Sequence, residues 1–215
     1  MDYYLGVDIG TTAVKSVAFS QSGEVLALHA VEYGMQHPHP GWSEQNPDEI
    51  LEGVIESINK VVTQMLPLNA ALVSFSAAMH SLILLDKSRQ AISPCIIWAD
   101  NRSEAIATKL RESKKGNSFY HKSGVPIHST SPLCKLLWMK ENDPKLFHAA
   151  EKFISIKEYI FYKLFAEEIV DISIAAASGL LNIQNLKWDE DILEYIGISD
   201  SKLSRLVSTK YNFKF

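Results

Sequence analysis

Several features that would mark a specialised class of protein are scarce in this 215-residue sequence. It has only two cysteines, Cys95 and Cys134, which lie far apart, so two buried reduced thiols are expected rather than a disulfide. There is no excess of basic residues, since 21 Lys and Arg face 25 Asp and Glu, and this balance argues against a nucleic acid partner. No apolar run is long enough to cross a bilayer, so no membrane partner is expected.

The N-terminus and the connecting segments lack special features as well. Met1–Tyr4 has neither the basic region nor the apolar region of a signal peptide, which favours a cytoplasmic location. There is no internal repeat, low-complexity tract or Gly/Ser linker. What remains is an ordinary globular composition, 47% hydrophobic and 21% charged, sufficient for one large domain or two small ones.

The hydrophobic pattern of the first third predicts strands followed by one long helix. Strands are expected at Tyr3–Val7, Ala13–Phe19 and Val25–Val31, joined as an antiparallel meander. A long amphipathic helix is expected between Asn46, its cap, and Pro67. In that helix Glu49 is expected to close a capping-box-like pair with Asn46.

The rest of the chain predicts shorter strands and then mostly helices. The fold class is therefore α/β, with a mixed sheet and helices against it. The expected elements are a short buried strand at Ala71–Ser76, strands at Ser81–Leu85 and Cys95–Trp98, helices at Glu104–Arg111, Cys134–Glu141, Ile156–Phe165 and Asp189–Ile196, and helix starts at Asp143 and Ser199.

The stretch Leu5–Lys15 is the most informative part of the sequence. An apolar strand runs into Asp8, a glycine and two threonines, and a second apolar strand follows. A carboxylate beside a tight turn rich in hydroxyls and backbone N–H groups is typical of a site for a metal-bound phosphate. The stretch is not a Walker loop, because Gly-Lys-Ser/Thr is absent and no helix follows the turn.

Each residue of this turn has a role in such a site and a structural alternative. Asp8 is expected to hold Mg²⁺ beside a transferring phosphate, although it could also simply end the strand and cap the turn. Gly10 is expected to supply positive φ, and Thr11 and Thr12 hydroxyl and N–H donors. Lys15 either reaches the phosphates as a point charge or is a solvated strand lysine.

Two short motifs after apolar strands predict a sugar pocket. Met79 and His80 follow small residues at the C-terminal end of a predicted strand, where α/β sheets bind ligands, although His80 alone could be structural. Trp98, Asp100 and Arg102 follow another strand. Trp98 offers a flat aromatic surface, Asp100 offers two acceptor oxygens for hydroxyls, and Arg102 offers a planar guanidinium for a carboxylate. For Arg102 alone, the charged start of a helix is an equal alternative.

Four further charged residues are expected to be structural. Lys135, Lys157 and Glu158 lie near predicted helix starts and are expected as solvated or paired surface charges. Asp171 is expected to cap a helix. The other histidines do not have the spacing of zinc ligands, so no zinc site is expected.

Taken together, these motifs resemble the FGGY family of carbohydrate kinases along essentially the whole chain. The resemblance implies the actin/hexokinase/Hsp70-like ATPase fold, also called ribonuclease H-like. The pieces that carry it occur in the family's order: Gly6–Thr12, Trp42–Pro47, Met79–His80, Trp98–Arg102, Ser123–Pro126 and Asp171–Gly179.

The resemblance also implies roles for individual residues. Asp8 matches the catalytic acidic residue that lies at the family's metal and phosphate site. The residues that match the family's contacts to the ATP phosphates are Gly10, Thr11, Thr12 and Lys15. Met79 and His80 match the pair that contacts the sugar, Trp98 matches the aromatic wall of the sugar pocket, and Asp100 and Arg102 belong to the same motif. ATP and Mg²⁺ are the implied cofactors.

Within the family the motifs look most like the gluconokinase forms, for example at Ser76–Ser81, Trp98–Glu104 and Ile156–Ile160. This implies phosphorylation of the terminal hydroxyl of D-gluconate to give 6-phosphogluconate, with Arg102, His80 and Lys135 as candidate partners for the carboxylate. A xylulokinase-like pentulose kinase is the alternative, and a non-catalytic sugar-binding fragment is a second one.

The resemblance implies that residues 1–215 are the N-terminal, sugar-binding domain of such a kinase. The family's general base is an Asp in a motif that opens a second domain, and that motif is expected beyond Phe215. The chain by itself is therefore expected to bind sugar rather than to turn it over. The expected partner is a small-molecule substrate, gluconate or a related polyol. A homodimer of the kinase is an allowed oligomeric state.

Overall fold

A computed structural model describes residues 2–214, and Met1 and Phe215 lie outside the described residues. The chain divides into two compact units. The first comprises Met1–Met35 and Gln45–Ala78, and the second comprises Gln36–Glu44 and Met79–Phe215. Each unit is described by itself.

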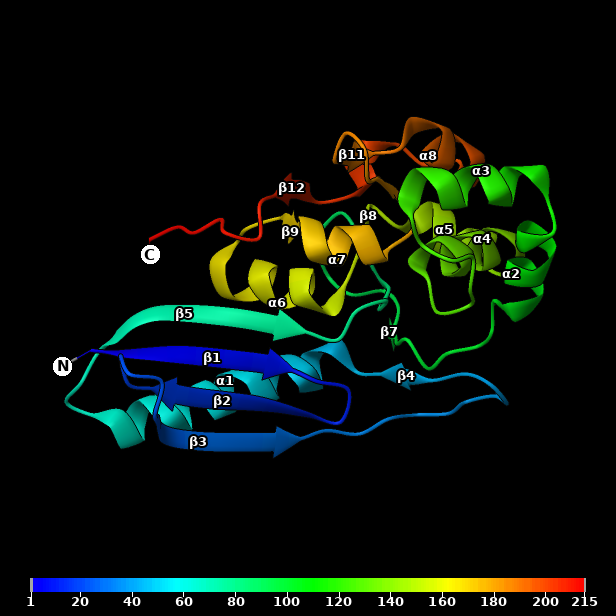
Figure 1. The fold of residues 1–215 in the computed structure, drawn as a ribbon. Helices are drawn as coiled ribbons and strands as arrows, with labels where there is room; N and C mark the ends of the chain where they lie inside the picture. The colour runs from blue at the N-terminus through cyan, green and yellow to red at the C-terminus, as the bar shows by residue number, and fades with distance from the viewer. Residues whose placement is uncertain (1, 215) are drawn as a thin grey trace. The chain divides into compact units, whose positions relative to one another are not determined.

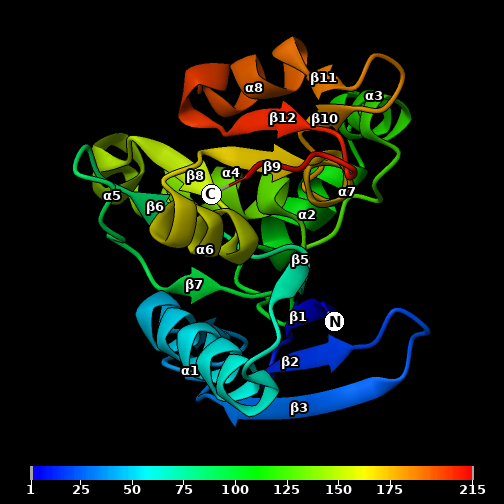
Figure 2. The ribbon, with the colours of Figure 1, turned by 90° about the vertical axis from the view of Figure 1, so that its left-hand side faces the viewer.

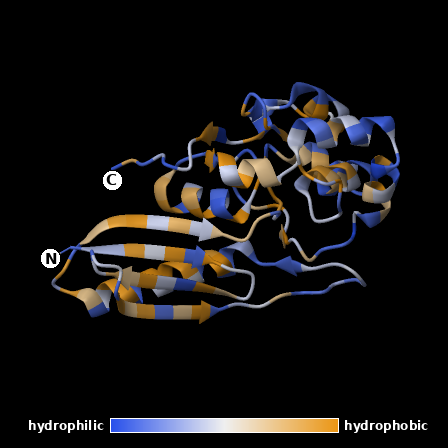
Figure 3. Ribbon diagram, viewed as in Figure 1, coloured by the Kyte–Doolittle hydropathy of each residue, from blue (hydrophilic) through white to orange (hydrophobic). Residues whose placement is uncertain are grey.

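The first unit is a four-stranded mixed sheet with one long helix (Figures 1 and 2). The strand order is β3-β2-β1-β5, in which β1 pairs antiparallel with β2 and parallel with β5. Figure 3 shows that these strands are largely hydrophobic. The elements are β1 (Tyr3–Ile9), β2 (Ala13–Phe19), β3 (Val25–Glu32), α1 (Pro47–Met65) and β5 (Ala70–Ala77), and the two-residue strand β4 (Glu44–Gln45) lies at the boundary of the units.

Helix α1 packs on one face of this sheet because alternate residues of β1 and β2 present apolar or small side chains there. Val14 of β2 is fully buried, and the hydroxyls of Ser16 and Ser57 hydrogen-bond at 2.8 Å between strand and helix. The helix and the sheet are in contact at Gly53, where a Cβ would lie 3.5 Å from side chains of β2 and β3, an ordinary van der Waals distance. Residues at the intervening positions, including Asp8 and Lys15, lie on the opposite face.

The second unit consists mostly of helices around short strands. Strands β6 and β8 pair antiparallel, β9 and β12 pair parallel, and β10 and β11 form a small hairpin. The elements are β6 (Ile83–Leu85), β7 (Cys95–Ile96), α2 (Glu104–Arg111), α3 (Lys114–Ser123), α4 (Pro132–Asn142), α5 (Pro144–Ala149), β8 (Lys152–Ile154), α6 (Ile156–Phe165), β9 (Ile169–Asp171), α7 (Ile172–Ala177), β10 (Leu181–Asn182), β11 (Lys187–Trp188), α8 (Glu190–Ile196), the 3₁₀ helix η1 (Asp200–Lys202) and β12 (Arg205–Val207).

Helix α4 is the centre of the apolar core of the second unit. Residues 132–137 are all buried, and because they are consecutive they come from every side of the helix. A helix that is apolar nearly all round is enclosed by its neighbours. Any polar side chain on α4 is therefore also removed from water unless it lies near an end.

The structure confirms much of the predicted architecture. The α/β class with a mixed sheet is confirmed, and β2, α2 and α6 have the predicted bounds. Asn46 caps α1 by accepting from the N–H of Asp48 at 2.9 Å. Both cysteines are buried and free.

Several details differ from the predictions. Glu49 accepts a hydrogen bond from the N–H of Gly34 instead of closing a box with Asn46. Strand β5 is half-exposed rather than buried, because it forms the edge of its sheet and has β1 as its neighbour. Strands β6 and β7 belong to separate two-stranded sheets, since an apolar run does not reveal its pairing partner. Gly10 is not among the residues with positive φ.

Candidate functional site

Three polar side chains meet on the open face of the first unit's sheet. Asp8 on β1 and Lys15 on β2 are directly paired across the antiparallel ladder, and Asp8 also pairs with Ser76 on β5. The hydroxyl of Ser76 donates to Oδ1 of Asp8 at 2.6 Å. Side chains that are paired in this way lie on the same face of the sheet, so Lys15 and Asp8 are neighbours. The Asp8 carboxylate is exposed and retains acceptor capacity beyond the Ser76 bond.

The turn after β1 is closed by a hydrogen bond from the N–H of Gly10 to the carbonyl of Ala13 at 3.0 Å. A Cβ on Gly10 would lie 2.8 Å from that same carbonyl oxygen. Glycine is therefore required here by a close backbone approach, not by a left-handed conformation. This replaces the predicted reason for Gly10 while keeping its place in the turn.

Donors from residues 33–45 hold three successive carbonyls of this turn. The hydroxyl of Tyr33 donates to the carbonyl of Gly10, and the side-chain amide of Gln45 donates to Thr11 at 2.8 Å. The N–H of Tyr33 donates to the carbonyl of Thr12 at 3.2 Å. In a trans peptide the N–H points opposite to the preceding carbonyl. The N–H groups of Thr11 and Thr12 are therefore directed away from Tyr33 and Gln45, as an anion-binding turn requires.

The donor set at Asp8 fits a hydrated Mg²⁺ ion. Magnesium is commonly held by one or two carboxylates, with water and substrate phosphate completing its octahedron. Among the described residues no group of three or more His, Cys, Asp or Glu side chains is placed to hold a metal by itself. Asp8 would therefore act as the carboxylate ligand, directly or through water, together with a bound phosphate.

In the second unit His80 has an unusual backbone conformation. Its φ is +67°, in the left-handed region, although it is not a glycine. Burial lowers the pKa of the His80 imidazole, while a backbone hydrogen bond at Ala177 acts in the opposite direction and the charge of Lys135 lowers the pKa further. The neutral imidazole is thus favoured near neutral pH. Met79, beside it, is 40% exposed.

The Trp98–Arg102 segment contains one exposed aromatic ring and a buried ionic cluster. Trp98 is 47% exposed, whereas the side chains of Asp100 and Arg102 are 0% and 4% exposed. Oδ1 of Asp100 accepts from Nε of Arg102 at 2.9 Å, and Oδ2 accepts from Nη2 at 2.8 Å. Glu44 also accepts from Arg102, and the guanidinium lies 3.7 Å from the ring centroid of Trp42.

This arrangement changes what Asp100 and Arg102 are able to do. The Asp100 carboxylate and the Arg102 guanidinium are hydrogen-bonded to each other, and Oδ2 of Asp100 also accepts from the N–H of Ser43 at 2.7 Å. A buried guanidinium with two carboxylate partners is not placed to meet a third carboxylate from a ligand. The geometry instead makes this cluster a clamp that ties the loop containing Trp42 to the segment that presents Trp98.

Two predicted surface charges are buried, contrary to expectation. Lys135 is 0% exposed on the enclosed helix α4. Glu158 is also buried, and its carboxylate accepts from the N–H of Ser155 at 2.6 Å in the capping box of α6. Burial raises the pKa of Glu158. The error has one cause, since a short pattern near a helix start does not reveal whether neighbouring elements cover it.

The other two charges behave as predicted. Asp171 caps α7 by accepting from the N–H groups of Ser173 at 3.1 Å and Ile174 at 3.3 Å. Its second oxygen accepts from Nζ of Lys157 at 2.7 Å. The interpretation of Asp171 as a helix cap and of Lys157 as a paired charge is confirmed.

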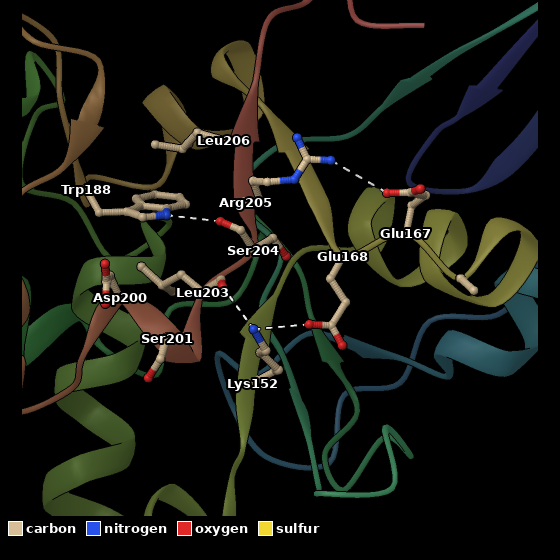
Figure 4. A pocket seen from close by; sticks show the side chains of 11 residues that line it. Lys152, Glu167, Glu168, Trp188, Asp200, Ser201, Leu203, Ser204, Arg205 and Leu206 are labelled. Atoms are coloured by element: carbon tan, nitrogen blue, oxygen red, sulfur yellow. Dashed lines mark hydrogen bonds and ion pairs between the residues drawn. The ribbon is translucent and has the colours of Figure 1, made fainter. Parts of the chain in front are cut away.

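A cavity of about 530 Å³ lies elsewhere in the second unit (Figure 4). Its walls come from β8, the segment around Glu168, and residues 200–206, and none of the predicted site residues lines it. The basic groups of its wall are already paired, with Lys152 on Glu168 at 3.2 Å and Arg205 on Glu167 at 3.7 Å. This pairing leaves the cavity without an evident function.

Several residues that support the predicted site residues were not predicted as such from the sequence. Tyr33 has no motif around it. Gln45 and Ser76 lie within the Trp42–Pro47 and Ser76–Ser81 pieces of the family resemblance, which are the signals that point to them. Lys135 was interpreted as a surface charge although it contacts the carbonyl of His80.

Comparisons with known proteins agree with this fold. Residues 3–214 match the FGGY family of carbohydrate kinases, N-terminal domain. The chain is 44% identical to a gluconokinase of Bacillus licheniformis, over 96% of the chain and 40% of that protein. It is 32% identical to a xylulose kinase of Bacillus subtilis (strain 168), over 93% of the chain and 40% of that protein.

Solved structures give the same result. The crystal structure of a gluconate kinase from Lactobacillus acidophilus superposes with a TM-score of 0.93 at 33% identity, over 96% of this chain and 42% of that one. A ligand-bound xylulose kinase from the same organism gives the same values. The predicted sugar-kinase fold is confirmed, and the chain spans about two fifths of the length of the curated relatives it matches.

Proposed function

This chain belongs to the FGGY family of carbohydrate kinases, and on that premise we propose that it is part of an ATP-dependent kinase for D-gluconate. The reaction would transfer the γ-phosphoryl group of ATP to the terminal hydroxyl of gluconate, giving 6-phosphogluconate and ADP. The observation that carries the choice of sugar is the 44% identity to a gluconokinase, against 32% to a xylulose kinase. A pentulose kinase is the second candidate, favoured by the equal structural match to a xylulose kinase.

Phosphoryl transfer depends on positioning and on neutralisation of charge. We assign these tasks to the β1–β2 turn, where the N–H groups of Thr11 and Thr12 would donate to phosphate oxygens. Lys15 would add a positive charge next to Asp8. Bound Mg²⁺, held by Asp8, would supply the neutralisation of phosphate charge. Ser76 would hold the Asp8 carboxylate in one orientation.

We assign sugar binding to the second unit. Trp98 would offer its exposed ring face to the carbon skeleton, and Met79 would add an apolar contact. His80 would act as a neutral imidazole, with one ring nitrogen bonded to the backbone of Ala177 and Nδ1 left to accept from a sugar hydroxyl. Asp100 and Arg102 would keep Trp98 in place without touching the sugar. The homodimer and the cytoplasmic location remain predictions.

A panel of acceptor sugars tests the proposal. The full-length protein that carries these residues is incubated with ATP, Mg²⁺ and either gluconate, xylulose or glycerol, and the release of ADP is measured. We expect kcat/KM for gluconate to exceed that for xylulose by at least about 100-fold, since polar groups left unpaired by a wrong substrate carry strong discrimination. A preference for xylulose would establish the second candidate, and no turnover with any acceptor would refute kinase function.

A further inference from the structure

Lys135 is a buried lysine whose ammonium faces backbone carbonyls. Its Nζ donates to the carbonyl of Ile97 at 2.8 Å, to that of Ile96 at 3.3 Å and, at a shorter distance, to that of His80. An ammonium has three donors, so these three acceptors match it fully. The acceptors belong to two segments 16 positions apart, one containing Met79 and His80 and the other leading to Trp98. Backbone hydrogen bonds between Leu82 and Ile96 also join these segments, and Lys135 adds the contact to His80 itself.

The held carbonyl of His80 is significant because this residue is strained. A non-glycine residue in the left-handed region is strained, and such a conformation persists where its surroundings enforce it. The carbonyl of His80 is fixed by Lys135, and among the described residues the buried Nδ1 of His80 has no hydrogen-bond partner. The imidazole also hydrogen-bonds to the backbone of Ala177, so its direction is fixed by this bond together with the Lys135 contact to the His80 carbonyl.

Lys135 is itself held firmly. It lies in the first half of α4, whose N-terminus is capped by Ser131, and the neighbouring Leu133 and Leu136 are buried in the core. The ammonium is thus delivered from the rigid centre of the second unit. A positioning group on a rigid helix orients binding residues more accurately than contacts within a loop.

We propose that Lys135 is the positioning residue of the sugar site, which holds the His80 and Trp98 segments in register through three backbone carbonyls. This inference rests on the proposed function and deepens it, because Lys135 touches no substrate. It also replaces the expectation that Lys135 pairs with the carboxylate of gluconate. A fully buried ammonium that is saturated by carbonyls cannot serve as that partner.

The protonation state of Lys135 links this role to pH. Burial lowers its pKa from 10.5 to about 7, opposed in part by Asp100 on the segment after β7. Cys95 on β7 and Cys134 on α4 act like Asp100, whereas Arg102 lowers the pKa further. Loss of the proton removes one of the three donors. The His80 segment should therefore be less firmly held at pH 8.5 than at pH 6.5.

The first test measures hydrogen exchange in the full-length protein, and it does not depend on catalysis. In Lys135→Met, which keeps the length of the side chain, amides of residues 79–82 and 95–102 should exchange at least about tenfold faster, because their carbonyl anchor is gone. The matched control is Lys140→Met, a half-buried lysine near the C-terminal end of the same helix that donates to the carbonyl of Tyr195 at 3.5 Å. Unchanged exchange in both segments would overturn the proposal, whether or not the protein phosphorylates gluconate.

The second test separates positioning from general destabilisation. In Lys135→Met the KM for the acceptor sugar should rise by about tenfold or more, since small displacements of binding groups are costly, while the KM for ATP stays within about twofold. In the unmodified protein the KM for the sugar should rise between pH 6.5 and 8.5, because Lys135 loses its proton. In Lys135→Met this rise should be absent. Equal changes in both KM values would show a merely structural role.

A variant that keeps a donor guards against a failure to fold. If Lys135→Met does not fold, Lys135→Gln retains an N–H₂ group and is compared in its place by the same two measurements. We expect its exchange rates in residues 79–82 and 95–102 and its sugar KM to exceed those of the unmodified protein. If Lys135→Gln is folded and matches the unmodified protein in both, the proposal fails.

Discussion

Replacing Arg102 by alanine tests the ionic clamp of the second unit. The guanidinium is 4% exposed and donates to two carboxylates, one of which belongs to the fully buried Asp100. Removing one partner of a buried pair leaves an uncompensated charge, at a cost of about 3–5 kcal/mol. The contact with the ring of Trp42 is lost at the same time. Against the usual 5–15 kcal/mol of a whole domain, this is a large fraction of the stability.

Tryptophan fluorescence during guanidinium unfolding is a suitable assay, because all four tryptophans lie in the second unit. The free energy of unfolding should fall by about 3–5 kcal/mol in Arg102→Ala. The control is Arg111→Ala, whose ion pair with Glu104 is about half exposed on both sides and should contribute no more than about 1 kcal/mol. Circular dichroism checks that the loss does not reflect a changed environment of Trp42.

A second variant shows whether the cost comes from the stranded charge. Arg102→Met combined with Asp100→Asn removes both members, so the double variant should be more stable than Arg102→Met alone. If Arg102→Ala costs less than about 1 kcal/mol, or no more than Arg111→Ala, the clamp makes no net contribution. Arg102 would then have to be reconsidered as a ligand contact.

Three further changes give separate predictions. Asp8→Asn should lower kcat of the full-length enzyme by about 100-fold or more with little change in the sugar KM, in a coupled ADP assay, and near-normal turnover would remove Asp8 from the phosphate site. Asp171→Ala should lower the free energy of unfolding by about 1–2 kcal/mol, because α7 loses its cap and Lys157 its partner, whereas an effect under 0.3 kcal/mol would contradict this. Between pH 7 and 10.5 Lys135 is protonated in the unfolded state but largely neutral in the folded state, so the free energy of unfolding rises with pH. At 1.36 kcal/mol per pH unit, the unmodified protein should gain roughly 5 kcal/mol relative to Lys135→Met. Parallel plots of unfolding free energy against pH for the two proteins would refute the lowered pKa.

The parts of the fold that could be predicted from the sequence are those with a local cause. Asn46, Asp171 and Asp189 each accept from backbone N–H groups at the start of a helix, and the bonded donors lie two or three residues ahead. Such contacts depend on short stretches of sequence, so the starts of these three helices were predicted accurately. Helix α4 begins at Pro132, two residues before the predicted start. The alternating pattern of β2 fixed its bounds for the same reason.

The parts that could not be predicted depend on contacts between distant segments. The strand that contains Leu84 pairs with β8, about 70 residues later, and its apolar run is equally compatible with any buried sheet. The turn proposed to bind phosphate was predicted from Asp8 to Thr12, but the donors that orient it come from Tyr33 and Gln45. The pairing of Arg102 with Glu44 likewise joins residues 58 positions apart.

Lys135 shows how such a contact can set stability against function. Charging it inside the core is unfavourable, so the stability of the second unit should rise as the pH increases above 7. The same loss of a proton removes one of the three donors that hold the carbonyls of His80, Ile96 and Ile97, so the sugar site should become less ordered. A lysine that served stability alone would give both quantities the same dependence on pH. If stability rises with pH while the order of the proposed sugar site falls, and both dependences disappear in Lys135→Met, the buried charge of Lys135 serves the site rather than the stability of the fold.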